Sequence, residues 1–285
     1  MFQTICTTLA IIAIILIWII LYDTHRFVVV RYSFSSDKIK KGFRMVMLSD
    51  LHNCQYGRDN MQLLTAIDKE KPDMIILAGD MITAEVKDKF STTIDLLRKL
   101  KEKYPIYYAY GNHEEKICRY KQRYDHMGDD FEKELKDMGI DPLYNAHAVL
   151  VEYGVAIYGL AIEHEYYQRF TTKPMGDRYM EGLIGKADHH YYDILIAHNP
   201  EYFAEYASWG ADLVLSGHIH GGMVRLPFLG GIISPAIRFF PKYDGGLFQI
   251  GKANMVLGRG IGNHRPNIRV FNPAELIVID LEPQK

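Results

Sequence analysis

The chain contains few cysteines, and this scarcity excludes two common architectures. Only three occur among its 285 residues, Cys6, Cys54 and Cys118, and they are widely scattered. A disulfide framework or a zinc knuckle needs more cysteines at closer spacing, so we expect neither. Cys54 and Cys118 lie near motifs described below, but no ligand spacing includes them. We interpret them as bystanders in a reducing compartment.

The chain also lacks an excess of positive charge. Its 33 Lys and Arg residues nearly balance 35 Asp and Glu residues, which gives a net charge of −2. Nucleic-acid-binding domains are generally basic, so we expect no nucleic-acid partner. The composition, 48% hydrophobic and 24% charged, is that of a globular protein. We find no internal repeat, and we predict one globular domain after the N-terminal segment.

Residues 5–21 lack charge altogether. Ile and Leu dominate this stretch, and Phe2, Trp18 and Tyr22 stand at its edges. A membrane helix needs roughly 20 apolar residues, and aromatic residues at both ends are typical of the membrane interface. A cleaved signal peptide is the alternative, but no Lys or Arg precedes the run and no small-x-small site follows it. We therefore predict a single-pass cell-membrane anchor over residues 1–22.

Basic residues follow this anchor, whereas none precedes it. The positive-inside rule therefore predicts a cytoplasmic location for the rest of the chain. Residues 23–43 are polar and basic, and we expect a tether there. The alternation of apolar and polar residues over 27–32 favours an edge strand as the alternative. The globular domain is expected to cover residues 44–285.

From residue 44 onward, strand-like and helix-like patterns alternate, which predicts an α/β fold. Short apolar runs predict strands at 45–48, 74–77, 106–110, 194–197 and 213–215. Helical spacing of apolar residues predicts helices over 58–70, 87–103, 129–138 and 200–208. Two strands are expected around a turn at 153–154, and short strands at 223–226, 246–250, 253–257 and 276–281.

The five apolar runs share one feature, because each ends just before side chains that bind metals. In chain order these candidate ligands are Asp50, His52, Asp80, Asn112, His198, His218 and His220. In open α/β sheets ligands bind at the carboxyl ends of the strands, so we expect these loops to meet. A single histidine is most often a surface or core residue. The joint order of these seven residues distinguishes them from that ordinary case.

Seven such donors exceed what one metal ion needs, so we predict two divalent ions that share a bridging carboxylate. Two divalent ions bring a charge of about +4, and two carboxylates with one hydroxide remove about three charges. The site is thus left net positive, which suits a phosphate group. Mn, Fe and Zn all accept His, Asp and Asn ligands, so the identity of the metals stays open.

The order Asp50-x-His52, Gly79-Asp80, Gly111-Asn112-His113-Glu114, Ala197-His198 and Gly217-His218-x-His220 resembles the calcineurin-like metallophosphoesterase superfamily. The similar motifs span residues 44 to about 226. The segments 217–222 and 259–262 make the chain more similar to the membrane-associated branch that includes UDP-diacylglucosamine hydrolases. Met223 and Glu114 depart from residues common in that branch, which affects the expected substrate more than the chemistry.

The resemblance implies a four-layer α/β/β/α sandwich of two mixed sheets. It also implies that one metal is held by Asp50, His52 and His220, the second by Asn112, His198 and His218, and that Asp80 bridges them. His113 would face the leaving-group oxygen as an acid or electrostatic stabiliser, and Glu114 would support the ligands. The nucleophile would be a metal-bridging hydroxide that attacks phosphorus in line.

The implied function is hydrolysis of a phosphodiester or pyrophosphate, and we expect a lipid-linked or nucleotide-linked substrate. A protein or nucleotide phosphatase of the same fold is one alternative. A non-catalytic, metal-binding scaffold is another. The sequence gives no prediction of the oligomeric state.

Several other segments bear on the substrate. Residues 223–240 are rich in Leu, Ile and Phe, and they form either a packed hairpin or an apolar lip that contacts a membrane or an acyl chain. Nearby cations are candidates to bind phosphate or lipid headgroups, namely Arg238, Lys242, Arg259 and Arg265. The basic, aromatic segment 119–124 either caps the cleft or forms a solvated helix face. His164 is a candidate to border the site.

Overall fold

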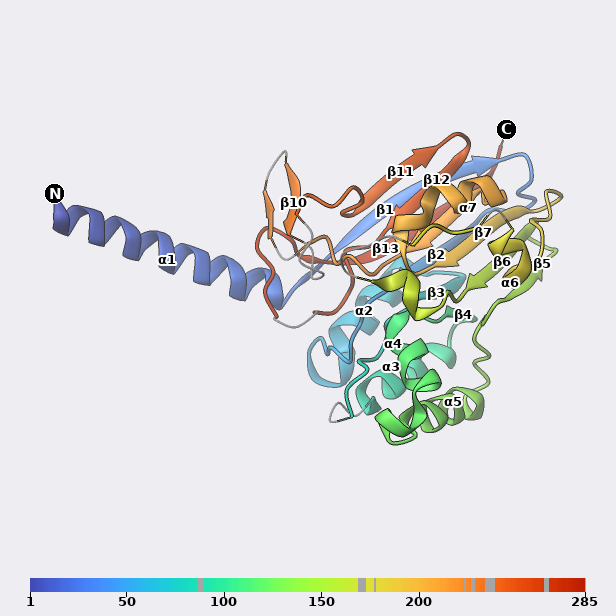
Figure 1. The fold of residues 1–285 in the computed structure, drawn as a ribbon, viewed down its shortest axis with the longest axis horizontal. Coiled ribbons are helices and arrows are strands. Elements are labelled where there is room, and N and C mark those ends of the chain that lie inside the picture. Colours follow the sequence, from blue (N-terminus) through green and yellow to red (C-terminus); the bar gives the residue numbers. More distant parts are fainter. Residues whose placement is uncertain are drawn as a thin grey trace.

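A computed structural model describes residues 1–86, 90–168, 173–176, 178–222, 224–226, 229–233, 239–263 and 267–284 (Figure 1). A single long helix, α1 (Phe2–Thr24), projects from a body of two β-sheets with helices on their outer faces. The most apolar window of α1 has a mean hydropathy of 2.8, and none of that window is buried. The helix is therefore long and apolar enough to cross a membrane, as the sequence predicted.

The first sheet has five strands in the order β1-β13-β2-β3-β4. Their bounds are β1 (Phe27–Ser36), β13 (Ala274–Pro283), β2 (Phe43–Leu48), β3 (Met74–Ala78) and β4 (Ile106–Ala109). β2, β3 and β4 run parallel, whereas β13 is antiparallel to β2 and parallel to β1. The segment 23–43 therefore contains an edge strand, and the expectation of a tether there was wrong. Ten residue pairs join β1 to β13, so the chain enters the sheet directly after α1.

The second sheet has six strands in the order β11-β12-β8-β7-β6-β5. Their bounds are β11 (Gly246–Ile250), β12 (Ala253–Leu257), β8 (Leu213–Ser216), β7 (Tyr192–Ala197), β6 (Val155–Leu160) and β5 (Ala146–Leu150). The four inner strands are parallel, and each outer strand is antiparallel to its neighbour. A separate hairpin, β9 (Val224–Leu226) and β10 (Gly230–Ile233), follows β8.

Six helices beyond α1 lie in the described part of the body. They are α2 (Met61–Glu70), α3 (Ser91–Lys101), α4 (Asn112–Arg119), α5 (Met127–Asp137), α6 (Tyr179–Ile184) and α7 (Phe203–Trp209). Short 3-10 turns stand at Arg58–Asn60, Lys121–Tyr124, His164–Tyr167 and Pro200–Tyr202. The predicted helices at 58–70, 129–138 and 200–208 are present within a few residues of their expected ends. The predicted helix over 87–103 begins at Ser91, and residues 87–89 lie outside the described part.

Three hydrophobic cores separate four layers. Because successive strand residues point to opposite faces, Met45 and Met47 of β2 pack between the two sheets, whereas Val46 and Leu48 pack against α2, α3 and α5. On β7, Leu195 faces outward in the same way and packs against α6 and α7. The predicted α/β/β/α sandwich of two mixed sheets is confirmed. Its strands β2, β3, β4, β7 and β8 all end just before the candidate ligands.

Candidate metal centre

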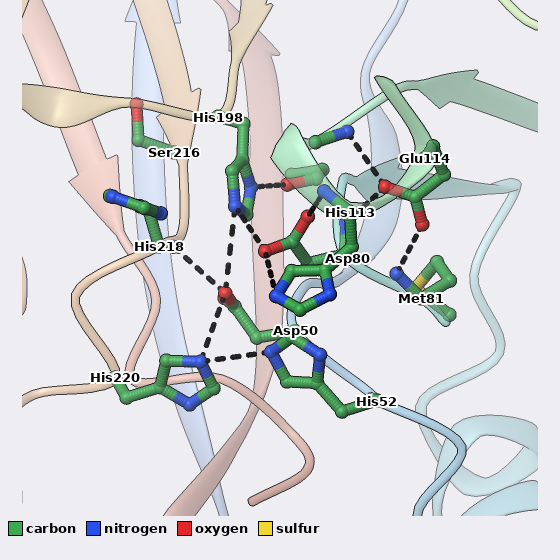
Figure 2. Close-up of polar contacts among 12 residues, drawn as sticks. Asp50, His52, Asp80, Met81, His113, Glu114, His198, Ser216, His218 and His220 are labelled. Carbon is green, nitrogen blue, oxygen red and sulfur yellow. Dashed lines mark hydrogen bonds and ion pairs between the residues drawn. The ribbon is translucent and has the colours of Figure 1, made fainter. Parts of the chain in front are cut away.

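Six of the seven candidate ligands gather at one edge of the two sheets, namely Asp50, His52, Asp80, His198, His218 and His220 (Figure 2). Donor atoms of Asp50, His52 and His220 lie within 4.8 Å of one another, and so do those of Asp80, His198 and His218. The first group contains the three residues expected to hold one ion, and the second contains His198 and His218 together with the expected bridge, Asp80. A third group consists of His52, Asp80 and His113, so the Asp80 carboxylate lies near donors of both other groups.

Left-handed backbone conformations mark the loops of the centre. Asp50, His52, Asp80, His218 and His220 all have positive φ, between 48° and 76°. A non-glycine residue in this region costs about 1–2 kcal/mol, and such residues persist only where surrounding contacts hold them. Five of them in one cluster indicate that packing of the loops holds the ligands in place.

Two glycines let the ligand loops approach each other. A Cβ atom at Gly111 would collide with the carboxylate of Asp80, and one at Gly217 would collide with that of Asp50. The backbone beside each glycine donates to the same carboxylate: His113 N–H to Asp80 Oδ1 at 2.8 Å, and His218 N–H to Asp50 Oδ1 at 2.9 Å. Both aspartates are thus oriented by the loops that they contact.

His198 is fixed with one ring nitrogen toward the centre. Its Nδ1 lies 2.7 Å from the carbonyl oxygen of Ala78, so Nδ1 carries the proton and donates it there. Its Nε2 is therefore the nitrogen that faces the centre, and it lies 3.0 Å from Asp80 Oδ2 and 3.7 Å from Asp50 Oδ1. A ligating histidine commonly donates its second nitrogen to a carbonyl in this way, because the bond sets the ring orientation.

The electrostatics of the metal-free site depend on burial and on the two carboxylates. Burial, opposed by the charge of His198, raises the pKa of Asp50 to about 6. Burial favours a raised pKa for Asp80 as well, but the charges of His198 and His113 outweigh burial and hold the pKa of Asp80 well below its usual value. Burial disfavours a charged His198, yet Asp80 and Asp50 raise its pKa to about 10. Burial and the charge of His198 lower the pKa of His218 to about 3, so the His218 imidazole is neutral near pH 7.

Buried polar atoms in the centre test whether metal ions fit there. Asp50 Oδ2 and Asn112 Oδ1 are buried without a hydrogen-bond partner. Leaving one such atom unsatisfied costs about 1–3 kcal/mol. Carboxylate, amide and imidazole donors are the ligands that divalent cations take in proteins. The residues therefore fit metal ions, and metal binding is consistent with the donors that they present.

His113 stands beside the centre with a defined tautomer. The backbone N–H of Ala84 donates to His113 Nδ1 at 2.7 Å, so Nδ1 accepts and the proton is on Nε2. Nε2 lies 3.9 Å from Asp80 Oδ2, and the ring centroid lies 4.8 Å from that of His52. His113 thus presents an N–H donor to the centre. For Nε2 to act as a base, the ring proton would have to be on Nδ1 instead, and the hydrogen bond from Ala84 would be lost.

Glu114 ties the loops after β3 and β4 together. Its buried carboxylate accepts hydrogen bonds from the backbone N–H groups of Asp80, Met81 and Gly111 at 2.7–2.9 Å, and from the Tyr108 hydroxyl at 2.8 Å. Burial, followed by the charge of Asp80, raises its pKa to about 7. Glu114 is also the third residue of α4, and its side chain caps the helix by accepting from the backbone N–H of Gly111, the residue before α4. This cap explains why the expected loop at 111–114 starts a helix instead.

Asn272 is a supporting residue that sequence reasoning missed. Its Nδ2 donates to the carbonyl oxygens of His220 at 2.8 Å and Gly222 at 2.6 Å, which holds the loop after β8. No motif includes Asn272, and the only signal is the Asn272-Pro273 dipeptide, which marks a turn.

Other predicted residues lie away from the two ligand sets. Arg259 forms an ion pair with the buried Glu275, with 3.1 Å between Arg259 Nε and Glu275 Oε1, and its role in substrate binding stays a prediction. Arg265 lies outside the described residues. The ring of His164 packs edge-on against Tyr120, 6.4 Å between centroids, rather than within the ligand sets. Among described residues, the metal-type clusters contain neither Cys54 nor Cys118.

Comparison with known proteins agrees with the chemistry of the site. The family model "Calcineurin-like phosphoesterase" matches residues 43–222. The uncharacterized metallophosphoesterase YkuE of Bacillus subtilis is 26% identical over 264 residues, which covers 85% of this chain and 79% of YkuE. The phosphodiesterase YaeI of Escherichia coli is 25% identical over 78% of this chain and 76% of its own length.

A third relative is longer than this chain. The uncharacterized metallophosphoesterase Cj0846 of Campylobacter jejuni is 27% identical over 87% of this chain, and the match spans 61% of Cj0846. Because the family model covers more than half of the chain, including every candidate ligand, this protein belongs to the calcineurin-like phosphoesterase family and is a metallophosphoesterase.

Proposed function

We propose that this metallophosphoesterase is a membrane-anchored, dinuclear phosphohydrolase that cleaves a phosphodiester or pyrophosphate of a lipid-linked or nucleotide-linked substrate. One observation carries the proposal. Two groups of donors lie side by side, and the carboxylate of Asp80 has donors of both groups within 4.8 Å. One shared carboxylate between two sets is the arrangement that a pair of metal ions requires.

Each ligand has a role in this proposal. Asp50, His52 and His220 hold the first ion, and Asn112, His198 and His218 hold the second. Bound Mn, Fe or Zn ions would polarise the phosphoryl oxygens and lower the pKa of bound water. The neutral state of His218 and Asn112 limits the negative charge of the ligand set to two carboxylates. The centre therefore stays positive toward a phosphate.

His113 is proposed to serve the leaving group. Its Nε2–H lies beside the ligand sets, and the hydrogen bond from Ala84 to Nδ1 keeps that proton on Nε2. A donor in this position stabilises the negative charge that develops on the departing oxygen. The Nδ1 contact also fixes the ring, so no reorientation is needed during the reaction.

The kind of substrate is inferred from the surroundings of the site. The relative YaeI is named a phosphodiesterase, which favours a diester over a monoester. The helix α1 would hold the enzyme at a membrane, which favours a substrate with a lipid part. A protein or nucleotide phosphatase remains the second candidate. The presence of all seven donors and of His113 favours an enzyme over a non-catalytic scaffold.

The test is the substitution Asp80→Asn, with bis-p-nitrophenyl phosphate as substrate. The amide keeps the size of the side chain but removes the charge that both ions would share, so we expect hydrolysis to be abolished while the fold is retained. Asp95→Asn on α3 is the matched control, since that side chain is 64% exposed. Unchanged turnover by Asp80→Asn would refute the bridging role.

The orientation of the enzyme is a separate part of the proposal. All the basic residues near α1 follow it in the sequence, which favours a cytoplasmic catalytic domain. Proteolysis of sealed cells should therefore leave the catalytic domain intact. Digestion of that domain from outside would place it on the opposite side of the membrane.

A further inference from the structure

We propose that a second surface, in addition to α1, contacts the membrane: an apolar rim around the base of the helix that rests on the lipid bilayer. The rim consists of Leu226, Leu229, Phe239, Phe240, Ile268 and Phe271. This inference depends on the membrane anchor in the function proposed above. It does not depend on the hydrolytic activity.

The end of α1 is docked against the body. Asp23 is 3% exposed and Thr24 8% exposed, whereas Tyr22, one residue earlier, is 52% exposed. The backbone N–H of Asn272 donates to Asp23 Oδ2 at 3.2 Å, and Asn263 Nδ2 donates to the carbonyl oxygen of Thr24 at 3.0 Å. The helix therefore leaves the body at a fixed place, beside the loop that carries Ile268 and Phe271.

The last turns of α1 have the character of a membrane interface. The rings of Trp18 and Tyr22 stack with centroids 5.4 Å apart, and the Arg26 guanidinium lies 4.4 Å from the Tyr22 centroid. Trp, Tyr and Arg favour the headgroup level, where an apolar ring meets a polar surface. At a rise of 1.5 Å per residue, Trp18 lies about 9 Å along the helix from Thr24. Protein surface around Thr24 is thus at the depth of the headgroups.

Backbone contacts join the segments that carry the rim to this exit point. The loop before Asn272 forms a bridge between Val270 and Val224 of β9, and Arg225 N–H donates to the carbonyl oxygen of Val270 at 3.0 Å. β9 pairs with β10, and Phe240 N–H donates to the carbonyl oxygen of Ile232 in β10 at 2.9 Å. Figure 1 shows β10 on the side of the body from which α1 projects. These bonds connect every part of the rim to the base of α1.

The exposure of the rim requires an apolar partner. Leu229, Phe239 and Phe240 are 64–66% exposed, and Phe271 is 46% exposed. Contiguous exposed apolar residues of this size mark a surface that contacts a membrane or another protein. The bilayer is the occupant that we infer, because the membrane around an inserted α1 already reaches the protein at this place. Of the two sequence expectations for residues 223–240, this surface corresponds to the apolar lip.

The rim also bears on the metal centre. Asn272 contacts Asp23 through its backbone N–H and holds the carbonyl oxygen of the ligand His220 through its side chain. One residue thus joins the base of the anchor to the loop after β8. A rim seated on the bilayer would hold that ligand loop at the level of the lipid headgroups.

Fluorescence quenching by brominated lipids in nanodiscs tests the rim with the full-length chain. The chain has two tryptophans, Trp18 and Trp209, so both are replaced by Phe, and Phe239→Trp or Phe271→Trp is added singly. Val151→Trp is the matched control, since Val151 is 60% exposed but lies next to β5, outside the rim. A chain with Trp209→Phe alone keeps Trp18 as the reporter of anchor insertion.

We expect lipids brominated near the headgroups to quench the tryptophans at 239 and 271, and not the one at 151. Quenching at Trp18 without quenching at 239 and 271 would overturn the rim and leave the anchor intact. A blue-shifted but unquenched tryptophan at 239 would also overturn it, because the rim would then be covered by protein, such as a second copy of the chain. Absence of quenching at Trp18 would overturn the anchor and the rim together.

Discussion

Replacement of Glu114 by Gln should destabilise the two loops that carry Asp80 and Asn112. The Glu114 side chain is fully buried. One carboxylate oxygen accepts from the N–H groups of Asp80 and Gly111, both at 2.9 Å. The other accepts from the N–H of Met81 at 2.7 Å and from the Tyr108 hydroxyl at 2.8 Å. Every contact of this carboxylate is therefore with a donor.

Glutamine has the same shape but only one acceptor oxygen. In one orientation of the amide, the NH2 group faces the N–H groups of Asp80 and Gly111. In the other orientation, it faces the N–H group of Met81. One or two buried N–H groups lose their acceptor, and each loss costs about 1–3 kcal/mol. We expect a total loss of about 1–6 kcal/mol, compared with the 5–15 kcal/mol typical of folded domains.

Chemical denaturation of the metal-free protein measures this loss. Glu102→Gln is the control, because Glu102 is exposed and follows α3 at a distance from the centre. The Glu114→Gln variant should also bind metal more weakly, since the loops that hold Asp80 and Asn112 lose their common acceptor. A variant that loses less than about 1 kcal/mol and binds metal normally would refute the reasoning.

Two further predictions concern the chemistry of the centre. His113→Ala should slow hydrolysis of bis-p-nitrophenyl phosphate by roughly 100-fold or more while metal stays bound, and loss of metal instead would identify His113 as a ligand. Metal uptake near pH 7 should release about one proton, because His198 with a pKa of about 10 is protonated in the metal-free site and must lose its proton to bind. The apparent affinity should therefore rise with pH from 7 toward 10, and it should fall more steeply below about pH 6, where Asp50 also becomes protonated. Calorimetry in two buffers of different ionisation enthalpy measures the proton count, and an affinity that is the same at pH 7 and pH 8 would contradict this assignment.

The parts of the fold that the sequence predicts are those with a local physical signal. Buried parallel strands appear in the sequence as short apolar runs, so β3 and β8 were predicted within one residue of their bounds. A tether was the main expectation where β1 lies, and a strand was only the alternative. The outer position of β1 in the sheet leaves it only partly buried. The helix α4 was missed because it has only eight residues and begins at polar groups of the site.

The gathering of the candidate donors was predictable because metal chemistry restricts residue types at strand ends. The supporting contacts were not predictable in the same way. Asn272 reaches the His220 loop from 52 residues away in the chain, and nothing in its neighbourhood indicates that contact. The apolar rim was visible as composition over 223–240, but the participation of Ile268 and Phe271 depends on the bridge between Val224 and Val270.

Metal analysis of the active, full-length enzyme tests the central claim most directly. The protein would be purified in detergent without chelator, and bound transition metals would be counted per chain alongside hydrolysis of bis-p-nitrophenyl phosphate. We predict two ions per chain, loss of both ions and activity after chelation, and recovery of both when metal is returned. Full activity in protein that contains no transition metal would contradict the account.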